Sequence, residues 1–354
     1  MGWRAVVHGE GLCDFGGSQS ADMPPAPRGS LMVETRLAAT QAPQTILALT
    51  LTQPNHGTLT LKAVPGGGIV LVIARRHEVF HAAVKLDAEA RTDILRITYS
   101  WDQKGGRGRL AIEWPERQIT RWSDTGPAIP IGAQDIRRLG GFFDLRVAHP
   151  DLIYAALSDI VEPLGPMPTL ALETPILTPD GYRCAGRMRR GDCVVEPDGR
   201  PPEIVLDAVT RTVPAFGSFA PVRLRAPYFG LTRDIVVSPE QRLLVGGSEV
   251  EYTFGCEHVL VPARHLVNGI AAMWADHDGL AEYVQLLLPR HAPVIAAGTV
   301  VESLFVGRMR RNEPVRRASL LGGIDPVFLP EQARAPYRVL SPFEAMTLAN
   351  RRAA

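Results

Sequence analysis

The sequence LALETPILTPDG, residues 170–181, sets the pattern for the second half of the chain. A short apolar run ends there in a Pro-Asp-Gly turn at residues 179–181. Proline presets the backbone angle φ at the start of such a turn, and glycine accepts the positive φ at its end. The same turn recurs at residues 197–199. Short apolar strands separated by explicit turns are typical of all-β proteins, so this stretch predicts a β domain.

The first half of the chain alternates between apolar and polar residues. Ile97, Tyr99 and Trp101 alternate with polar neighbours, so on a strand they would share one face. Residues 108–114 repeat the alternation, and the glycine-rich residues 102–108 suit a hairpin loop between the two strands. Successive amphipathic hairpins predict two sheets packed face to face. We therefore expect a jelly-roll-like β-sandwich that resembles the lectin-like laminin-G and concanavalin-type domains.

The composition is that of an ordinary globular protein. The chain has 354 residues, of which 45% are hydrophobic and 21% charged, and its formal net charge is +1. This balanced charge predicts no general affinity for nucleic acid. No apolar run approaches the roughly 20 residues that a membrane-spanning helix needs. The four cysteines form no C-x-x-C pair, so neither a disulfide scaffold nor a zinc cage is expected.

No secretory signal is visible at the N-terminus, because no basic start is followed by an apolar core. We expect a cytoplasmic protein by default, with export that needs no signal left open. No cofactor is expected. Trp101, Trp114 and Trp122 would suit stacking on sugars, although burial in the core is the commoner fate of tryptophan. A carbohydrate or a protein therefore stays open as the ligand of the sandwich.

Changes of pattern along the chain predict five segments. They are a loose glycine-rich N-terminal extension (1–30), the sandwich (31–154), a proline-rich linker (155–168), a second all-β domain (169–306) and an arginine-rich C-terminal extension (307–354). The clearest helix of the chain is expected near the end of the last segment. Ser341 suits its N-cap, and Glu344 follows three residues later, the spacing of a capping box.

Four stretches of the second half resemble, in order, segments of the Hint (hedgehog/intein) family of the bacterial type. They are ETPILTPDG with the following MRRGDCVV, then RDIVVSPEQRLLV, VLVPARHLVNG and LLLPRHAPVIAAGTVVESL. The resemblance covers residues 169–306 and implies a compact β horseshoe that processes its own chain. In that family the first residue, normally cysteine, attacks the carbonyl before it in an N–S acyl shift. A histidine protonates the departing amide nitrogen.

The positions that carry this chemistry in the family are occupied here by other residues. Thr169 stands where the family has its cysteine, and Gln241 stands where it has its catalytic histidine. A threonine hydroxyl is a much weaker nucleophile than a thiol, and glutamine cannot exchange a proton near pH 7. Where a splicing module ends in His-Asn, this chain has Glu302 and Ser303 and continues. We therefore interpret the domain as degenerate for autoprocessing, with a binding or structural role.

Two histidines remain in the matching segments, His265 and His291. Each is either a surviving acid or base or a side chain that bonds a backbone group at a strand end, and we favour the second interpretation. With Thr169 and Gln241 they make up the candidate site. The alternative to degeneracy is an N–O acyl shift at Thr169, which would cut the bond after Pro168 and give fragments of 168 and 186 residues.

The first half also contains HEVFH, residues 77–81, which matches the zinc-peptidase motif H-E-x-x-H. On a helix, His77 and His81 would face the same side as zinc ligands, with Glu78 as general base. The segment also alternates as a strand, on which histidines four positions apart lie too far from each other to share one ion. No convincing third ligand follows. We expect a strand and no metal, and keep a zinc peptidase as a second alternative.

Overall fold

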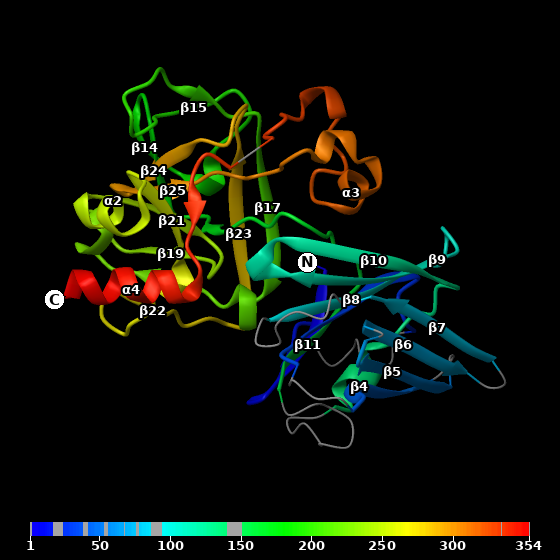
Figure 1. Cartoon of the computed structure of the whole chain (residues 1–354). Coiled ribbons are helices and arrows are strands. Elements are labelled where there is room, and N and C mark those ends of the chain that lie inside the picture. Colours follow the sequence, from blue (N-terminus) through cyan, green and yellow to red (C-terminus); the bar gives the residue numbers. More distant parts are fainter. Residues whose placement is uncertain are drawn as a thin grey trace. The chain divides into compact units, whose positions relative to one another are not determined.

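The computed structural model describes residues 2–16, 24–37, 42–52, 56–66, 68–75, 78–85, 94–139, 151–333 and 335–353. The chain folds into two compact units, unit 1 (Met1–Gly165) and unit 2 (Pro166–Ala354) (Figure 1). Both consist mainly of antiparallel strands, so the protein is mainly β, as its sequence predicts.

Unit 1 contains two antiparallel sheets. Over the described residues, the larger sheet has the order β10-β9-β8-β3-β11-β1-β2 and the smaller has the order β4-β5-β6-β7. The larger sheet consists of β1 (Trp3–His8), β2 (Gly11–Asp14), β3 (Arg28–Thr35), β8 (Leu95–Asp102), β9 (Arg107–Trp114), β10 (Ile119–Gly126) and β11 (Leu152–Ser158). The smaller consists of β4 (Gln44–Leu51), β5 (Gly57–Val64), β6 (Gly68–Arg75) and β7 (Glu78–Val84). The helical segments described in this unit are η2 (Pro115–Arg117) and α1 (Ala133–Arg137).

One apolar core lies between the two sheets of unit 1. Ile97 and Tyr99 of β8 meet Leu59 and Leu71 of the smaller sheet in this core. Trp101 of β8 is also buried, and its ring nitrogen donates a hydrogen bond to the carbonyl oxygen of Ala26 at 2.9 Å. The alternation along β8 therefore predicted the core face correctly. Trp101 is a core residue and offers no surface for stacking on a sugar.

The polar residues Arg96, Thr98 and Ser100 of β8 are buried as well. Arg96 on the opposite face is 2% exposed, and its Nε lies 3.0 Å from a carboxylate oxygen of Glu34. A second carboxylate, that of Glu113, lies 3.6 Å from Arg96 Nη1. The buried charges therefore compensate each other, as buried ions must.

The N-terminal residues belong to the sandwich. β1 pairs with β11 on one side and with β2 on the other, and Trp3 is 2% exposed. The expected loose extension over residues 1–30 is therefore wrong for the described residues 2–16 and 24–30. The apolar alternation of β1 is only six residues long, and the glycine-rich sequence around it hid the strand. β11 also continues to Ser158, so the linker expected from residue 155 begins later.

Residues 78–81 of the HEVFH segment lie on a strand. β7 pairs antiparallel with β6, and His81 stands opposite Val72 with its side chain exposed. The helix that the zinc motif requires does not form over Glu78–Val84, because this segment alternates and closes the smaller sheet. His77 lies outside the described residues. In the part of the chain that the structure describes, no group of three or more potential metal ligands occurs.

Unit 2 contains two larger sheets and one short strand pair over its described residues. The first sheet, in the order β17-β23-β12-β19-β18-β22, consists of β12 (Leu170–Ala171), β17 (Asp207–Pro214), β18 (Val222–Leu224), β19 (Ile235–Val237), β22 (Ala272–Trp274) and β23 (Leu280–Leu287). The second, in the order β14-β13-β24-β25-β20-β21-β26, consists of β13 (Pro175–Thr178), β14 (Gly181–Cys184), β20 (Arg242–Gly246), β21 (His258–Pro262), β24 (Pro293–Ala296), β25 (Thr299–Glu302) and β26 (Arg338–Val339). The pair is β15 (Cys193–Val194) and β16 (Glu203–Ile204).

The helical segments of unit 2 are short. They are η3 (Ala185–Arg187), η4 (Gly217–Phe219), η5 (Tyr228–Gly230), α2 (Ser248–Phe254), η6 (Ala263–His265), η7 (Met309–Arg311), α3 (Glu313–Ala318), η8 (Pro326–Phe328) and α4 (Pro342–Ala353). α4 confirms the helix expected near the end of the chain. Among the described residues, no helix has the length and apolar character needed to cross a membrane.

Three strand ends bring the candidate site together. Thr169 directly precedes β12, Gln241 directly precedes β20, and Glu302 is the last residue of β25. β12 is hydrogen-bonded between β19 and β23, so the first residues of the second half are held from both sides. The sheets thus place residues that are far apart in sequence within hydrogen-bonding distance.

Candidate functional site

Thr169 is buried at the start of the Hint-like half. Thr169 is 8% exposed, and its carbonyl oxygen accepts a hydrogen bond from the amide of Ser238 at 2.7 Å. The next residue, Leu170, pairs with Val237 of β19 and with Val284 of β23. The backbone on the C-terminal side of the bond between Pro168 and Thr169 is therefore fixed by neighbours on both sides.

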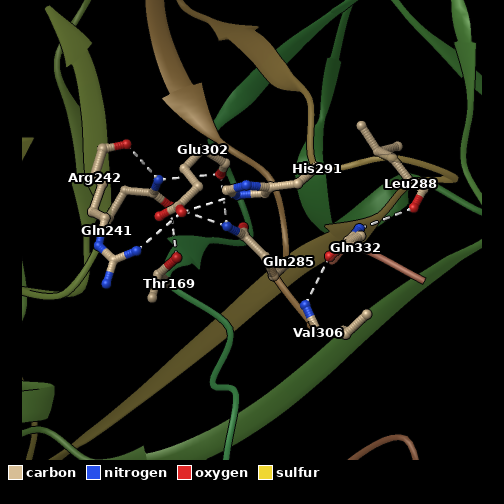
Figure 2. Close-up of polar contacts among 9 residues, drawn as sticks. All are labelled: Thr169, Gln241, Arg242, Gln285, Leu288, His291, Glu302, Val306 and Gln332. Carbon is tan, nitrogen blue, oxygen red and sulfur yellow. Dashed lines mark hydrogen bonds and ion pairs between the residues drawn. The ribbon is translucent and has the colours of Figure 1, made fainter. Parts of the chain in front are cut away.

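Gln241 binds the hydroxyl of Thr169. Figure 2 shows the two side chains in contact, with 2.6 Å between Thr169 Oγ1 and Gln241 Oε1. The other end of the Gln241 amide, Nε2, donates to the carbonyl oxygens of Arg242 at 2.9 Å and of Glu302 at 3.2 Å. Carbonyl oxygens only accept hydrogen bonds, so they determine which end of the amide is nitrogen. The Thr169 hydroxyl must therefore be the donor to Gln241.

A second buried glutamine holds Gln241 in this orientation. Gln285 of β23 is 3% exposed, and its Nε2 donates to the Glu302 carbonyl oxygen at 2.8 Å and to Gln241 Oε1 at 3.3 Å. Turning the Gln241 amide over would leave several buried groups unpaired, each at a cost of about 1–3 kcal/mol. Gln285 Oε1 itself has no hydrogen-bond partner among the described residues.

The carboxylate of Glu302 connects His291 to the same cluster. Glu302 Oε1 lies 3.1 Å from Arg242 Nη1 and 2.9 Å from His291 Nε2 (Figure 2). The contact with His291 is close but lacks the alignment of a hydrogen bond. The His291 ring also packs against Phe305, with 4.9 Å between ring centroids. His291 therefore faces Glu302, and among the described residues it makes no hydrogen bond to Thr169.

His265 lies apart from this hydrogen-bonded cluster, in η6. Burial, together with the charge of the neighbouring Arg264, lowers the pKa of His265 from 6.5 to about 4. Its Nε2 atom is buried without a hydrogen-bond partner in the described part of the chain. The first residue of η6, Ala263, donates its amide to the Gln241 carbonyl oxygen at 2.8 Å. η6 thus supports the backbone of Gln241, while the His265 side chain is half-buried and, with this lowered pKa, neutral at pH 7.

Of the four candidate residues, the structure joins Thr169 and Gln241 directly and His291 through Glu302, and it leaves His265 outside the cluster. Sequence reasoning missed Gln285 and the role of Arg242. A signal for Gln285 was present, because it is the single polar residue within the apolar run YVQLLL. A lone polar residue in a buried strand needs a hydrogen-bond partner.

In this cluster the Thr169 hydroxyl donates its hydrogen bond to the oxygen of an amide. The oxygen of an amide accepts a hydrogen bond but does not take a proton near neutral pH, so Gln241 is no general base. Two titratable residues of the cluster, His291 and Glu302, face each other. Among the described residues, the side chain that accepts the hydrogen bond of the Thr169 hydroxyl is thus an amide and not a titratable group.

The Hint domain family matches residues 168–308. No curated protein matches the chain. Among solved structures, the CBM40 module of Ruminococcus gnavus IT-sialidase bound to α2,3-sialyllactose is 13% identical, with 45% of this chain and 90% of that chain covered and a TM-score of 0.28.

Two further solved structures are similar at the same low level. The MchDnaB-1 intein is 19% identical, with 38% of this chain and 98% of that chain covered and a TM-score of 0.26. The LG1–3 region of the laminin α2 chain is 9% identical, with 87% and 57% covered and a TM-score of 0.25. Such scores carry no argument about function. The family match begins one residue before Thr169 and includes the whole hydrogen-bonded cluster: residues 168–308 of this protein are a Hint domain.

Proposed function

We propose that the Hint domain is degenerate for autoprocessing and that it serves as a folded structural and binding module. The observation that carries this proposal is the 2.6 Å hydrogen bond from the Thr169 hydroxyl to the amide oxygen of Gln241. In an acyl shift, this hydroxyl would lose its proton and its oxygen would attack the carbonyl carbon of Pro168. Gln241 cannot take that proton, so the hydroxyl keeps it.

The second half of the reaction also lacks its acid. As the bond between Pro168 and Thr169 breaks, the Thr169 nitrogen needs a proton, which histidine supplies in the family. Gln241 occupies that position here and cannot supply one. His291 Nε2 lies 2.9 Å from Glu302 Oε1, so this histidine faces a carboxylate. In this proposal, therefore, the first proton transfer has no acceptor and the second has no donor.

The mass of the intact chain tests this proposal. We expect freshly purified full-length protein to remain a single species of 38.5 kDa for several days, with and without an added thiol. The control is Thr169→Ala, which removes the only hydroxyl that this mechanism offers. Fragments of 168 and 186 residues from the unaltered chain, absent from Thr169→Ala, would establish threonine as an active nucleophile and overturn the proposal.

For unit 1, a carbohydrate is the ligand class we propose to test first. Trp122 of β10 is half-buried, which leaves part of an aromatic face for a sugar ring, unlike the buried Trp101. A glycan array probed with the full-length protein and with Trp122→Ala measures this directly. Signals that are the same for both proteins, or no signal at all, would argue against stacking at Trp122.

A further inference from the structure

The chain continues beyond the Hint match, which ends at residue 308, and the residues that follow pack on the Hint domain. Met309, Leu321 and Leu329 share a small apolar cluster with Val209 of β17 and Leu287 of β23. Residues 309–329 are therefore bound to the two longest strands of the first sheet.

Gln332, just after residues 309–329, is held by two hydrogen bonds. Its Oε1 accepts a hydrogen bond from the amide of Val306 at 2.8 Å, and its Nε2 donates to the carbonyl oxygen of Leu288 at 3.3 Å (Figure 2). Gln332 is only 4% exposed, so these bonds are shielded from water. The residues after Gln332 begin from a fixed point on unit 2.

Residues 337–353, which end the chain, form a self-contained strand and helix. The Ser341 amide donates to Glu344 Oε2 at 2.8 Å, and the Glu344 amide donates to Ser341 Oγ at 3.5 Å. These reciprocal bonds are the capping box expected from the sequence. Glu344 also forms an ion pair with Arg338 of β26, which joins the strand to the helix. The segment thus carries its own local stabilisation.

This segment docks on the edge of the second sheet. β26 pairs in parallel with β21, opposite Val259 and Leu260, and the Leu340 amide donates to the Leu260 carbonyl oxygen at 2.9 Å. It is the one parallel pair among the described strands. Figure 1 shows the segment in red at β21 and α2. Without it, β21 would be a free edge strand, which is a template for pairing with another chain.

The side chains of the docked segment form a satellite core. Leu340, Ala345 and Leu348 are 2–4% exposed and cluster with residues of α2 and β21, namely Val250, Val259 and Val261. The main core of unit 2 is a different cluster, which contains Leu170, Val237 and Val284 around the Thr169 site. Small cores with few buried apolar contacts open more readily than large ones. Val245 and Leu266 pack against both clusters, but the buried members of the two clusters differ, so we expect the satellite core to open before the main core.

We propose that residues 337–353 are a clasp: they occupy the open edge of β21 from within the same chain and are released as one unit while the rest of unit 2 stays folded. The site beneath the clasp, made of β21 and α2, fits an extended segment that runs parallel to β21 and continues into an amphipathic helix. This clasp is independent of self-processing, because it involves neither Thr169 nor Gln241.

The test compares two substitutions in the full-length protein by amide hydrogen exchange. Leu340→Asp places a carboxylate in the satellite core, whereas Phe343→Asp alters a side chain of the same segment that is 74% exposed. In Leu340→Asp we expect the amides of residues 340 and 345 to exchange at least about tenfold faster. The amide of Ser238, which bonds Thr169, should keep its protection. Phe343→Asp should exchange like the unaltered protein.

Two results with the Leu340→Asp variant would overturn the clasp. If the Ser238 amide loses protection together with residue 340, the segment is part of one cooperative core. If Leu340→Asp changes no amide, Leu340 does not hold the segment down. A measurement on the unaltered chain guards against a misfolded variant: as urea increases below the unfolding transition, the Leu340 amide must become exchangeable before that of Ser238. The reverse order would also refute the proposal.

Discussion

At Thr169 we expect substitution to restore the chemistry that we propose is missing, because the backbone and the neighbouring side chains remain in place. Thr169→Cys supplies a better nucleophile and leaving group, and Gln241→His supplies the group that moves the proton. A well-placed histidine contributes about 10²- to 10⁴-fold in rate. We therefore expect the double variant to cleave after Pro168 at least about 100 times faster than Thr169→Cys alone, as measured by mass spectrometry in the presence of thiol.

The single and double variants together locate the proton transfer. Equal cleavage rates for Thr169→Cys with and without Gln241→His would mean that position 241 does not reach the reacting bond. Gln285 should be left unchanged in both, because in the unaltered chain its Nε2 donates to Gln241 Oε1 and to the Glu302 carbonyl oxygen, and a nitrogen of a histidine at position 241 can accept such a bond. The additional variant Gln285→Leu tests whether that support orients the new histidine, since loss of orientation lowers the cleavage rate without removing a reacting group.

His265 gives unit 2 a pH dependence of known sign. Its pKa is lowered to about 4 in the folded chain, against 6.5 for an ordinary histidine, because burial and Arg264 disfavour the charged ring. Between these values the unfolded chain binds a proton that the folded chain does not, so the stability that neutral His265 contributes falls as the pH drops from about 6.5 to about 4. His265→Gln should flatten this part of the profile, measured by urea unfolding of the full-length protein at pH 7 and pH 4.5. An unchanged profile would contradict the lowered pKa of His265.

At the scale of elements, strands and helices with a strong local sequence signal could be predicted. Elements that depend on tertiary contacts could not. The alternation of β8 identified Ile97, Tyr99 and Trp101 as core, and Ser341 with Glu344 identified the start of α4. α2 was missed within a region interpreted as β, because its Val-Glu-Tyr-Thr-Phe sequence favours a strand. Its ending depends on Gly255, which takes a left-handed conformation with φ of 68°.

The candidate site divides in the same way. Thr169 and Gln241 were identified because they occupy the positions of the Hint family's cysteine and histidine in the matching segments. Such a match identifies positions along the chain. The bond between them, and the support from Gln285 and Glu302, depend on how β12, β20, β23 and β25 come together. Side-chain hydrogen bonds across 44 or more residues have no local sequence signal.

Strand β8 offers an element-scale prediction in unit 1. Arg96→Met keeps the length of the side chain but removes the charge that faces Glu34 and Glu113, which are 0% and 4% exposed. Removing one partner of a buried ion pair costs about 3–5 kcal/mol because the other charge is left uncompensated. We expect the free energy of unfolding of unit 1 to fall by that amount in urea titrations. The variant Glu34→Gln/Arg96→Met/Glu113→Gln should recover part of the loss, and a loss of under about 1 kcal/mol for Arg96→Met would show that water reaches these carboxylates.

At the scale of the whole molecule, the division into two units lies beside the bond that a self-processing domain would cut. Unit 1 ends at Gly165 and unit 2 begins at Pro166, three residues before Thr169. Each unit has its own apolar core, so residues 1–165 and residues 166–354, expressed as separate chains, should each unfold cooperatively in circular dichroism. Aggregation or non-cooperative unfolding of either chain alone would refute this.

Because 166–354 retains the clasp, its β21 edge should stay covered, and light scattering should report a monomer. A 166–354 chain with Leu340→Asp should instead associate as its concentration increases, because the edge of β21 and the satellite core are then exposed and can pair with another chain.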